Sequence, residues 1–112
     1  GASDVTQSPS ILWVWQKESA EMNCSHSKGA SYFHMYWFRQ QQGKPMELIA
    51  FTTLNQEPDF GTFSKEKYSA TKTVAQNGSF TVKKVQADDS GVYLCAVSEH
   101  SESHLMHCCT KT

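Results

Sequence analysis

The stretch DDSGVYLCAVSEH, residues 88–100, places a turn, a strand and a polar segment in direct succession. Asp, Ser and Gly are typical turn residues, and the alternation that follows is typical of a half-buried strand. Tyr93 and Cys95 are two residues apart, so they face the same side of that strand. The polar residues after Val97 fit an exposed loop, and they also fit the edge of a catalytic or metal site. The rest of the chain has to distinguish these two alternatives.

Length and composition describe a small globular domain. The chain has 112 residues, which is enough for one domain near the lower end of the sizes that build their own core. Hydrophobic residues make up 38% and charged residues 19%, which argues against a disordered chain. The net charge is −1 with no basic block, so nucleic acid and anionic membrane surfaces are poor candidate partners. No apolar run approaches the length needed to span a membrane, and ILWVW at residues 11–15 is only five residues long.

Four cysteines occur, at positions 24, 95, 108 and 109, and none forms a Cys-x-x-Cys pair. A zinc ribbon or a thioredoxin-type redox site therefore has no support. One widely spaced pair fits a buried disulfide of a secreted domain, and closing a loop of roughly 70 residues would stabilise the fold by about 4 kcal/mol. Cys108 and Cys109 are adjacent and would point to opposite faces of a strand, so we expect free thiols or an interchain disulfide there.

Short segments rich in β-branched and aromatic residues alternate with turns at the spacing of a sandwich, and no helical period is present. The predicted strands are AEMNCS (20–25), HMYWFRQ (34–40), MELIAF (46–51), KYSATKT (67–73), FTVKKV (80–85) and VYLCAV (92–97), with a last strand expected from Leu105. QQGKP (41–45), AQNGS (75–79) and QADDSG (86–91) are predicted turns. We therefore expect an all-β single domain over residues 1–112, with two packed antiparallel sheets and with residues 1–3 as a cloning remnant.

Four segments together resemble the variable-type immunoglobulin domain of antigen receptors, most closely the variable domain of a T-cell receptor β chain. They are VTQSPS (5–10), YWFRQ (36–40), KYSATK (67–72) and DDSGVYLCA (88–96), and the similarity runs from about Val5 to Val97. The resemblance implies a variable-type β-sandwich with a Cys24–Cys95 disulfide between its sheets and Trp37 packed on it. It also implies a tyrosine corner at Tyr93 and an ion pair between Arg39 and Asp89.

The end of the chain departs from that family. Joined receptor domains end in a Phe-Gly-x-Gly-Thr bulge, whereas this chain has MHCCTKT at 106–112. Met106, His107 and Cys109 occupy the Phe and Gly positions, and only Thr110 and Lys111 match. Glycines permit a bulge that twists this strand against a partner domain, so the last strand is expected to be atypical. Germline-only receptors, T-cell coreceptors and innate receptors also use variable-type domains without the bulge.

Strand phase predicts a surface for pairing. Trp37 and Arg39 point inward, so their neighbours on the same strand point outward. A patch of large apolar side chains on one outer face is uncommon on a soluble monomer, although scattered surface hydrophobics are a simpler explanation. In the family that this chain resembles, the corresponding sheet pairs two variable domains. We expect a hetero- or homodimer through Tyr36, Phe38, Gln40, Pro45 and Leu94.

The polar segment after Val97 corresponds to the third of three loops at one end of such a sandwich. These loops are SKGASY (27–32), TTLNQE (52–57) and SEHSESH (98–104), and rigid strands would hold them. Their Ser, Tyr, Asn and Gly content suits recognition by adaptable hydrogen bonds and a few aromatic anchors. The resemblance implies a peptide displayed on a histocompatibility molecule as the ligand. The candidate ligand-binding residues are Ser27, Lys28, Ser31, Tyr32, Thr52, Thr53, Asn55, Gln56, Glu99, His100, Ser101 and Glu102.

Other chemistries have little support. His100, His104 and His107 lie near Cys108 and Cys109, and zinc could use such ligands, but solvated loop histidines are more common. No motif supplies an activated nucleophile, so we expect no enzyme, no metal and no cofactor. Asn77-Gly-Ser in a predicted turn is the better of two glycosylation sequons, since Asn23-Cys-Ser adjoins a buried cysteine.

We therefore expect the extracellular domain of a cell-surface membrane protein that pairs through its outer face and recognises a ligand with three loops. The alternative is an innate receptor or coreceptor-type domain that homodimerises by the same face and binds an invariant ligand. The framework segments favour the first hypothesis, and the MHCCTKT ending favours the second.

Overall fold

The computed structural model describes residues 5–8, 12–29, 32, 34–54 and 56–98, and these residues form strands joined by turns and one short 3-10 helix. The elements are β1 (Val5–Ser8), β2 (Ala20–His26), β3 (His34–Gln40), β4 (Glu47–Thr53), β5 (Tyr68–Val74), β6 (Asn77–Val82), η2 (Ala87–Asp89) and β7 (Val92–Ser98).

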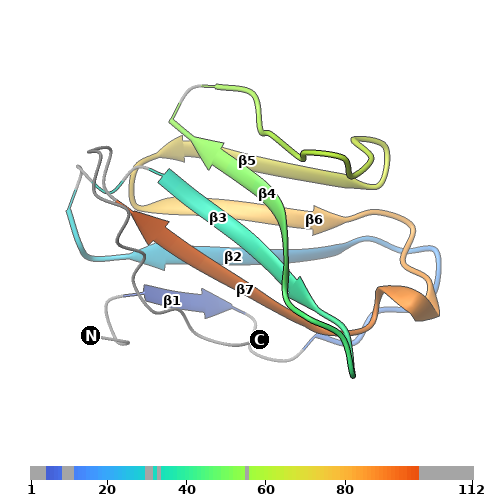
Figure 1. Ribbon diagram of the computed structural model, residues 1–112. Coiled ribbons are helices and arrows are strands. Elements are labelled where there is room, and N and C mark those ends of the chain that lie inside the picture. Colours follow the sequence, from blue (N-terminus) through green and yellow to red (C-terminus); the bar gives the residue numbers. More distant parts are fainter. Residues whose placement is uncertain (1–4, 9–11, 30–31, 33, 55, 99–112) are drawn as a thin grey trace.

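The strands form two sheets that pack face to face (Figure 1). One sheet has four strands in the order β1-β2-β6-β5, and the other has three in the order β4-β3-β7. Every pairing is antiparallel over the described residues. The predicted all-β fold with two antiparallel sheets is therefore confirmed.

Alternating burial explains why these segments form strands with one face inward. On β2, Met22 and Cys24 are buried while Glu21 and Asn23 are exposed, and on β3 Met35 and Trp37 are buried. A period of two in burial is the pattern of a strand that covers a core with one face only. The hydrophobic pattern of the sequence therefore sets which face of each sheet points inward.

A disulfide between Cys24 of β2 and Cys95 of β7 crosses the core, with the two Cα atoms 6.5 Å apart. This bond confirms the predicted pairing of the two cysteines. Trp37 lies opposite Cys95 in the β3–β7 register and is 0% exposed. The cross-link closes a separation of 71 residues, so by the chain-entropy account it stabilises the fold by about 4 kcal/mol.

Stacked aromatic rings fill the space beside the disulfide. The ring centroids of Trp37 and Phe80 are 5.5 Å apart, and those of Phe80 and Tyr68 are also 5.5 Å apart. Trp37 comes from the three-stranded sheet, and Phe80 and Tyr68 come from the four-stranded sheet. Such pairs contribute roughly 0.5–1.5 kcal/mol each beyond the burial of their area, so this stack ties the sheets together.

Several boundaries differ from the sequence prediction. β6 begins at Asn77 and ends at Val82, whereas the sequence predicted a strand over 80–85, because the β5–β6 turn needs only Ala75 and Gln76. Lys84 has a φ of 48°, a left-handed conformation that does not continue a strand. The predicted 86–91 turn contains η2. The last strand predicted from Leu105, with the MHCCTKT segment, lies outside the described residues.

Gly78 on β6 is required by a close approach of the two sheets. A Cβ atom at this position would lie 2.5 Å from Sδ of Met35, which is fully buried on β3. A side chain at this position would force the Met35 side chain to shift. The sequon residue Asn77 precedes this contact and is exposed.

Candidate functional site

The ends of four strands meet at one end of the sandwich. Figure 1 shows the end of β2, the start of β3 and the ends of β4 and β7 gathered at this end. The three loops predicted for recognition, residues 27–32, 52–57 and 98–104, follow or connect these strand ends. The topology therefore brings together the strand ends from which these three segments continue, although the strands are far apart in the sequence.

The first loop presents both polar and aromatic groups. Ser27 is exposed, and Lys28 and Tyr32 are half-buried. Nζ of Lys28 lies 5.3 Å from the centroid of the Tyr32 ring, a cation–π contact that holds the two side chains together. In the second loop, Gln56 is exposed. These residues can offer hydrogen bonds and an aromatic surface to a ligand.

The prediction that Thr52 is a ligand-binding loop residue is wrong. β4 runs on to Thr53, so Thr52 is paired with Met35 of β3 and is buried. Its Oγ1 donates a hydrogen bond to the carbonyl of Met35 at 3.1 Å. Thr53 is the last residue of β4 and is half-buried, so it belongs to the strand rather than to a loop. A β-branched run beside a buried apolar segment continues a strand readily, and this signal was available in the sequence.

Other predicted loop residues lie outside the described residues. They are Ser31, Asn55, Glu99, His100, Ser101 and Glu102, together with the cysteines Cys108 and Cys109.

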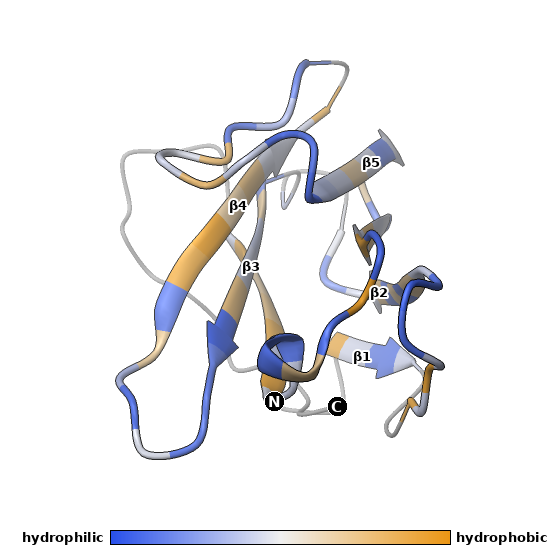
Figure 2. Cartoon of the chain, turned by 90° about the vertical axis from the view of Figure 1, so that its right-hand side faces the viewer, coloured by the Kyte–Doolittle hydropathy of each residue, from blue (hydrophilic) through white to orange (hydrophobic). Residues whose placement is uncertain are grey.

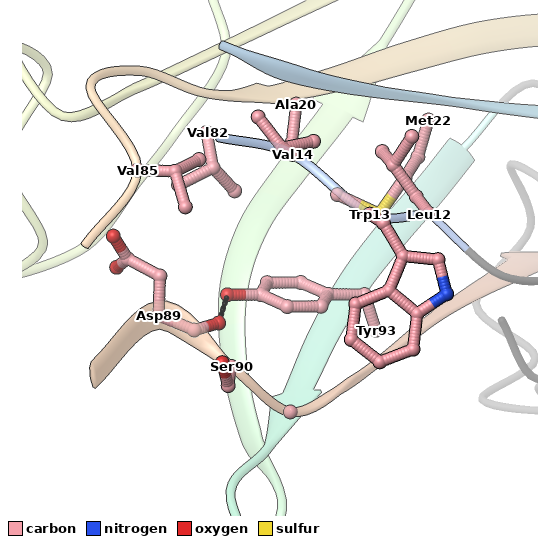
Figure 3. A pocket seen from close by; sticks show the side chains of 11 residues that line it. Leu12, Trp13, Val14, Ala20, Met22, Val82, Val85, Asp89, Ser90 and Tyr93 are labelled. Carbon is pink, nitrogen blue, oxygen red and sulfur yellow. Dashed lines mark hydrogen bonds between the residues drawn. The ribbon is translucent and has the colours of Figure 1, made fainter. Parts of the chain in front are cut away.

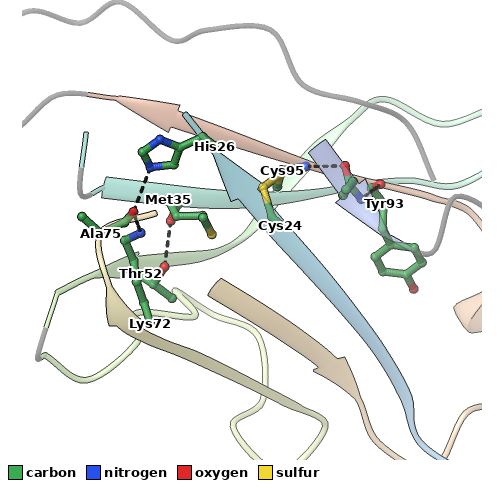
Figure 4. Close-up of a disulfide and its surroundings, with 9 residues drawn as sticks. Cys24, His26, Met35, Thr52, Lys72, Ala75, Tyr93 and Cys95 are labelled. Atoms are coloured by element: carbon green, nitrogen blue, oxygen red, sulfur yellow. Dashed lines mark hydrogen bonds between the residues drawn. A yellow bond between two sulfur atoms is a disulfide. The ribbon is translucent and has the colours of Figure 1, made fainter. Parts of the chain in front are cut away.

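A buried polar cluster that the sequence analysis missed lies beneath the first loop (Figure 4). Nε2 of His26 lies 2.8 Å from the carbonyl of Ala75, and Nζ of Lys72 donates to the same oxygen at 2.5 Å. Both side chains are buried. Burial lowers the pKa of Lys72 to about 8 and lowers the pKa of His26 below its usual 6.5. The alternation of β5, which turns Tyr68 and Lys72 to the same side, was the signal in the sequence.

The outer side of the three-stranded sheet carries an apolar surface made of Tyr36, Phe38, Leu48 and Phe51, here called the outer aromatic face. The ring centroids of Tyr36 and Phe51 are 5.0 Å apart, and those of Tyr36 and Phe38 are 6.5 Å apart. Phe38 is paired with Leu48, which is 48% exposed. In Figure 2 the middle of β4 is hydrophobic while the β3–β4 turn is hydrophilic. The sheet therefore presents apolar side chains to the outside.

The predicted pairing residues are distributed differently from expectation. Leu94 is opposite Phe38 in register, as strand phase predicts, but it is only 8% exposed and is not part of an exposed patch. All residues from Tyr93 to Ser98 are buried, so β7 is covered on both faces and alternation does not report exposure there. Gln40 and Pro45 are exposed. The exposed leucine beside Phe38 is Leu48, which was not predicted from the sequence, and not Leu94.

At the opposite end of the sandwich, the structure contradicts the ion pair predicted between Arg39 and Asp89. Arg39 instead bonds Glu47 at 2.8 Å, which is its neighbour in the β3–β4 register. Asp89 bonds Nζ of Lys67 at 2.6 Å. Lys67 directly precedes β5 and lies nearer to Asp89, so the carboxylate is already paired.

The tyrosine corner expected at Tyr93 is present at this end. Its hydroxyl donates a hydrogen bond to the carbonyl of Asp89 at 2.5 Å. Burial raises the pKa of Tyr93 because the phenolate would be poorly solvated. The Asp89 carboxylate also accepts the backbone N–H of Gln86 at 2.8 Å, which fixes the turn before β7.

A groove also lies at this end, with a volume of about 330 Å³ (Figure 3). Leu12, Val14, Val82 and Tyr93 line it, and Trp13 stands at its rim with 90% of its surface exposed. From the sequence, residues 11–15 stood out only as an apolar run too short for a membrane span. Residues 12–15 are not in a strand, so their side chains do not alternate between core and solvent.

The described residues contain no group of three or more His, Cys, Asp or Glu side chains placed to hold a metal ion. The predicted His100, His104, His107 and Cys108–Cys109 group lies outside this part of the chain. No helix among the described residues has the length and apolar character needed to cross a membrane.

Comparison with known proteins gives one family and a group of relatives. The model of the immunoglobulin V-set domain matches residues 7–108. The human T cell receptor beta variable 7-2 is 32% identical over 94 residues, which cover 84% of this chain and 80% of the relative. The mouse T-cell receptor alpha chain V region 2B4 is 31% identical over 100 residues, which cover 89% and 72%.

One similar solved structure concerns the "structural basis of T cell specificity and activation by the bacterial superantigen toxic shock syndrome toxin-1". The TM-score is 0.90 at 22% identity, and the match covers 96% of this chain and 93% of the other. At 22% identity, this similarity shows that the two chains share a fold.

Proposed function

This chain belongs to the immunoglobulin V-set family as an immune-receptor variable domain, and on that premise we propose that it recognises a ligand with its loops and pairs with a second variable domain. Domains of this kind bind other molecules and do not catalyse reactions. The loops at the ends of β2, β4 and β7 are the recognition surface, and the outer aromatic face is the pairing surface.

The observation that carries the pairing proposal is the outer aromatic face. Leu48 is 48% exposed and is paired with Phe38, and Met46, two residues before it, is 45% exposed. Exposed apolar side chains next to half-buried aromatic rings are typical of the centre of a protein interface. Gln40, exposed at the end of β3, supplies a polar group at the rim.

For the ligand we propose a peptide displayed on a histocompatibility molecule. The relatives that support this are T-cell receptor variable domains of both chain types. Tyr32 and Lys28 offer an aromatic and a cationic contact on the first loop, and Gln56 offers an amide on the second. The similarity to T-cell receptor variable domains also supports an extracellular location on a cell-surface membrane protein.

A second candidate is an innate receptor or coreceptor-type domain that homodimerises and binds an invariant ligand. The sequence feature in its favour is MHCCTKT at 106–112, where joined receptor domains have Phe-Gly-x-Gly-Thr. Both candidates use the same outer face, so the identity of the second subunit distinguishes them.

The pairing test compares Leu48→Glu with Val74→Glu. Both side chains are 48% exposed, but Val74 is on β5 of the other sheet, so it is a matched control. Sedimentation velocity measures self-association, and co-expression with a T-cell receptor α-chain variable domain measures heterodimer formation. We expect Leu48→Glu to weaken association at least tenfold, since it buries a charge in the interface, and Val74→Glu to leave it unchanged.

Association with neither partner, or an equal loss in both variants, would contradict the pairing proposal. Self-association without binding to the α-chain domain would favour the second candidate. The ligand is tested separately by binding to a panel of peptide–histocompatibility complexes, where Tyr32→Ala and Gln56→Ala should each reduce affinity and Val74→Glu should not.

A further inference from the structure

His26 is the last residue of β2, and both of its ring nitrogens are engaged. Nδ1 accepts a hydrogen bond from the backbone N–H of Lys28 at 3.2 Å, so Nδ1 carries no proton. The proton is therefore on Nε2, which donates to the carbonyl of Ala75 at 2.8 Å. The ring thus connects the first recognition loop to the β5–β6 turn and is neutral.

The Ala75 carbonyl has a second donor, because Lys72 bonds it at 2.5 Å and bonds the carbonyl of Val74 at 3.4 Å. Lys72 is buried, and its partners are carbonyl groups that carry no full negative charge. An ammonium group in such a position repels any further positive charge brought to the same oxygen. Figure 4 shows His26 and Lys72 meeting at Ala75 from different strands.

We propose that His26 is an acid-sensitive latch that holds the start of the first recognition loop to the β5–β6 turn and releases it when the imidazole is protonated. Protonation places a hydrogen on Nδ1, so this atom can no longer accept the N–H of Lys28. It also places a second cation on the carbonyl that already binds Lys72. The first effect breaks the hydrogen bond from the Lys28 amide, and the second weakens the bond to the Ala75 carbonyl.

The groups around the ring determine the direction of the effect. Lys72 of β5 and Lys28 of the loop are cations that disfavour the imidazolium, while the carbonyls of Ala75 and Tyr32 favour it. The aromatic ring of Tyr32 packs edge-on against the imidazole, with the two ring centroids 6.3 Å apart. Burial is the largest influence, and the net result is a lowered pKa for His26.

The direction of the pH effect on loop release follows from the linkage between protonation of His26 and release. A histidine whose pKa is lowered in the folded state binds fewer protons than it does in the unfolded or released state. The released loop is therefore favoured progressively as the pH falls through about 6.5. This range is the one in which histidine switches act in acidified compartments.

The test follows the amide of Lys28 and the ring nitrogens of His26 by NMR between pH 7.5 and 4.5. We expect the neutral Nε2-protonated form at pH 7.5, and a midpoint below about 6.5. The protection factor of the Lys28 amide should fall about tenfold through the same transition while the near-ultraviolet circular dichroism stays native. A Lys28 amide whose protection does not change while His26 titrates would overturn the proposal, as would a ring that stays neutral to pH 4.5.

Two variants separate the latch from a general effect of acid. Lys72→Met removes the neighbouring cation and keeps the length of the stem, so the His26 midpoint should rise by about 0.3–1 pH unit. Lys44→Met removes an exposed cation in the β3–β4 turn and should leave the midpoint unchanged. Equal midpoints in wild type and Lys72→Met would contradict the shared-carbonyl part of the proposal.

The consequence for ligand binding depends on the proposed function, whereas the latch itself is measured without any ligand. If the NMR transition occurs and no ligand is bound at any pH, the proposed function fails and the latch stands. If ligand binding occurs and the Lys28 amide does not respond to pH, the latch fails and the function stands.

Discussion

The side-chain amide of Gln7 donates a hydrogen bond to the carbonyl of Tyr93 at 2.7 Å, across a separation of 86 residues. Its oxygen accepts the backbone N–H of Cys95 at 3.1 Å. Gln7 is on β1 of the four-stranded sheet, and its partners are on β7 of the other sheet. One buried side chain therefore joins the two sheets beside the disulfide, because it satisfies a donor and an acceptor of the β7 backbone.

Replacing Gln7 by Leu should destabilise the domain by about 1–3 kcal/mol, because a buried N–H and a buried C=O would lose their partner. Urea unfolding followed by tryptophan fluorescence measures the change. Gln42→Leu, at an exposed position of the β3–β4 turn, is the control and should change stability by less than about 0.5 kcal/mol. Equal effects of the two variants would show that the bridge contributes nothing to stability.

Trp37→Ala should cost about 3–5 kcal/mol, because a fully buried indole leaves a cavity beside the disulfide and Phe80. Trp13→Ala makes the same chemical change at a side chain that is 90% exposed, so its cost should be below about 0.5 kcal/mol. Thermal unfolding of both variants gives the comparison. A large loss of stability for Trp13→Ala would mean that the segment at 12–15 packs on the groove more tightly than its exposure indicates.

The ion pair of Asp89 can be assigned by double-mutant cycles. Lys67→Met and Asp89→Asn should be coupled by roughly 0.5–1 kcal/mol, because Lys67 is partly solvated while Asp89 is buried. Arg39→Met and Asp89→Asn should be additive within about 0.5 kcal/mol, since Arg39 bonds Glu47 instead. Coupling in the second cycle and none in the first would restore the ion pair expected from the sequence.

Lys72 should give the domain a characteristic dependence on alkaline pH. Its pKa is about 8 in the folded state and 10.5 in the unfolded state, so the unfolded state binds more protons between these values. Stability contributed by this group therefore rises as the pH increases from 8 to 10.5. The difference in unfolding free energy between wild type and Lys72→Met isolates this contribution from the opposing titration of Tyr93. A difference that is constant over the range would show that Lys72 keeps its ordinary pKa.

Asn77 is exposed at the start of β6 and begins the sequon Asn77-Gly78-Ser79. We expect an N-linked glycan on this residue when the protein is secreted from animal cells. Mass spectrometry of Asn77→Gln should show loss of the glycan mass. Asn23→Gln, at the second sequon beside Cys24, is the control and should leave the glycan mass unchanged. A wild-type protein that carries no hexose would contradict the prediction.

Much of the fold could be predicted from the sequence because it depends on local pattern. Alternation placed Trp37 inward and Phe38 outward, and the resemblance to variable-type domains implied the tyrosine corner at Tyr93. Prediction was weaker where a strand has both faces covered. Leu94 is outward in phase and still buried, because the alternation of a strand gives the direction of a side chain and not what covers it.

The candidate sites depended more on contacts that the sequence does not encode locally. Thr52 was assigned to a loop, but β4 continues past it. The Asp89 carboxylate forms its ion pair with Lys67 and not with Arg39, and no spacing in the sequence distinguishes these two cations.

The sequence by itself determined that this chain is a β-sandwich, because side-chain alternation and turn residues act over a few positions, and its resemblance to variable-type immunoglobulin domains implied the Cys24–Cys95 cross-link. Only the tertiary structure decided that Gln7 bonds β7, that Lys72 and His26 share one carbonyl, and that Leu48 is exposed beside Phe38. The reason is that these contacts join strands distant in sequence, and sheet register and packing, rather than local pattern, bring their atoms within bonding distance.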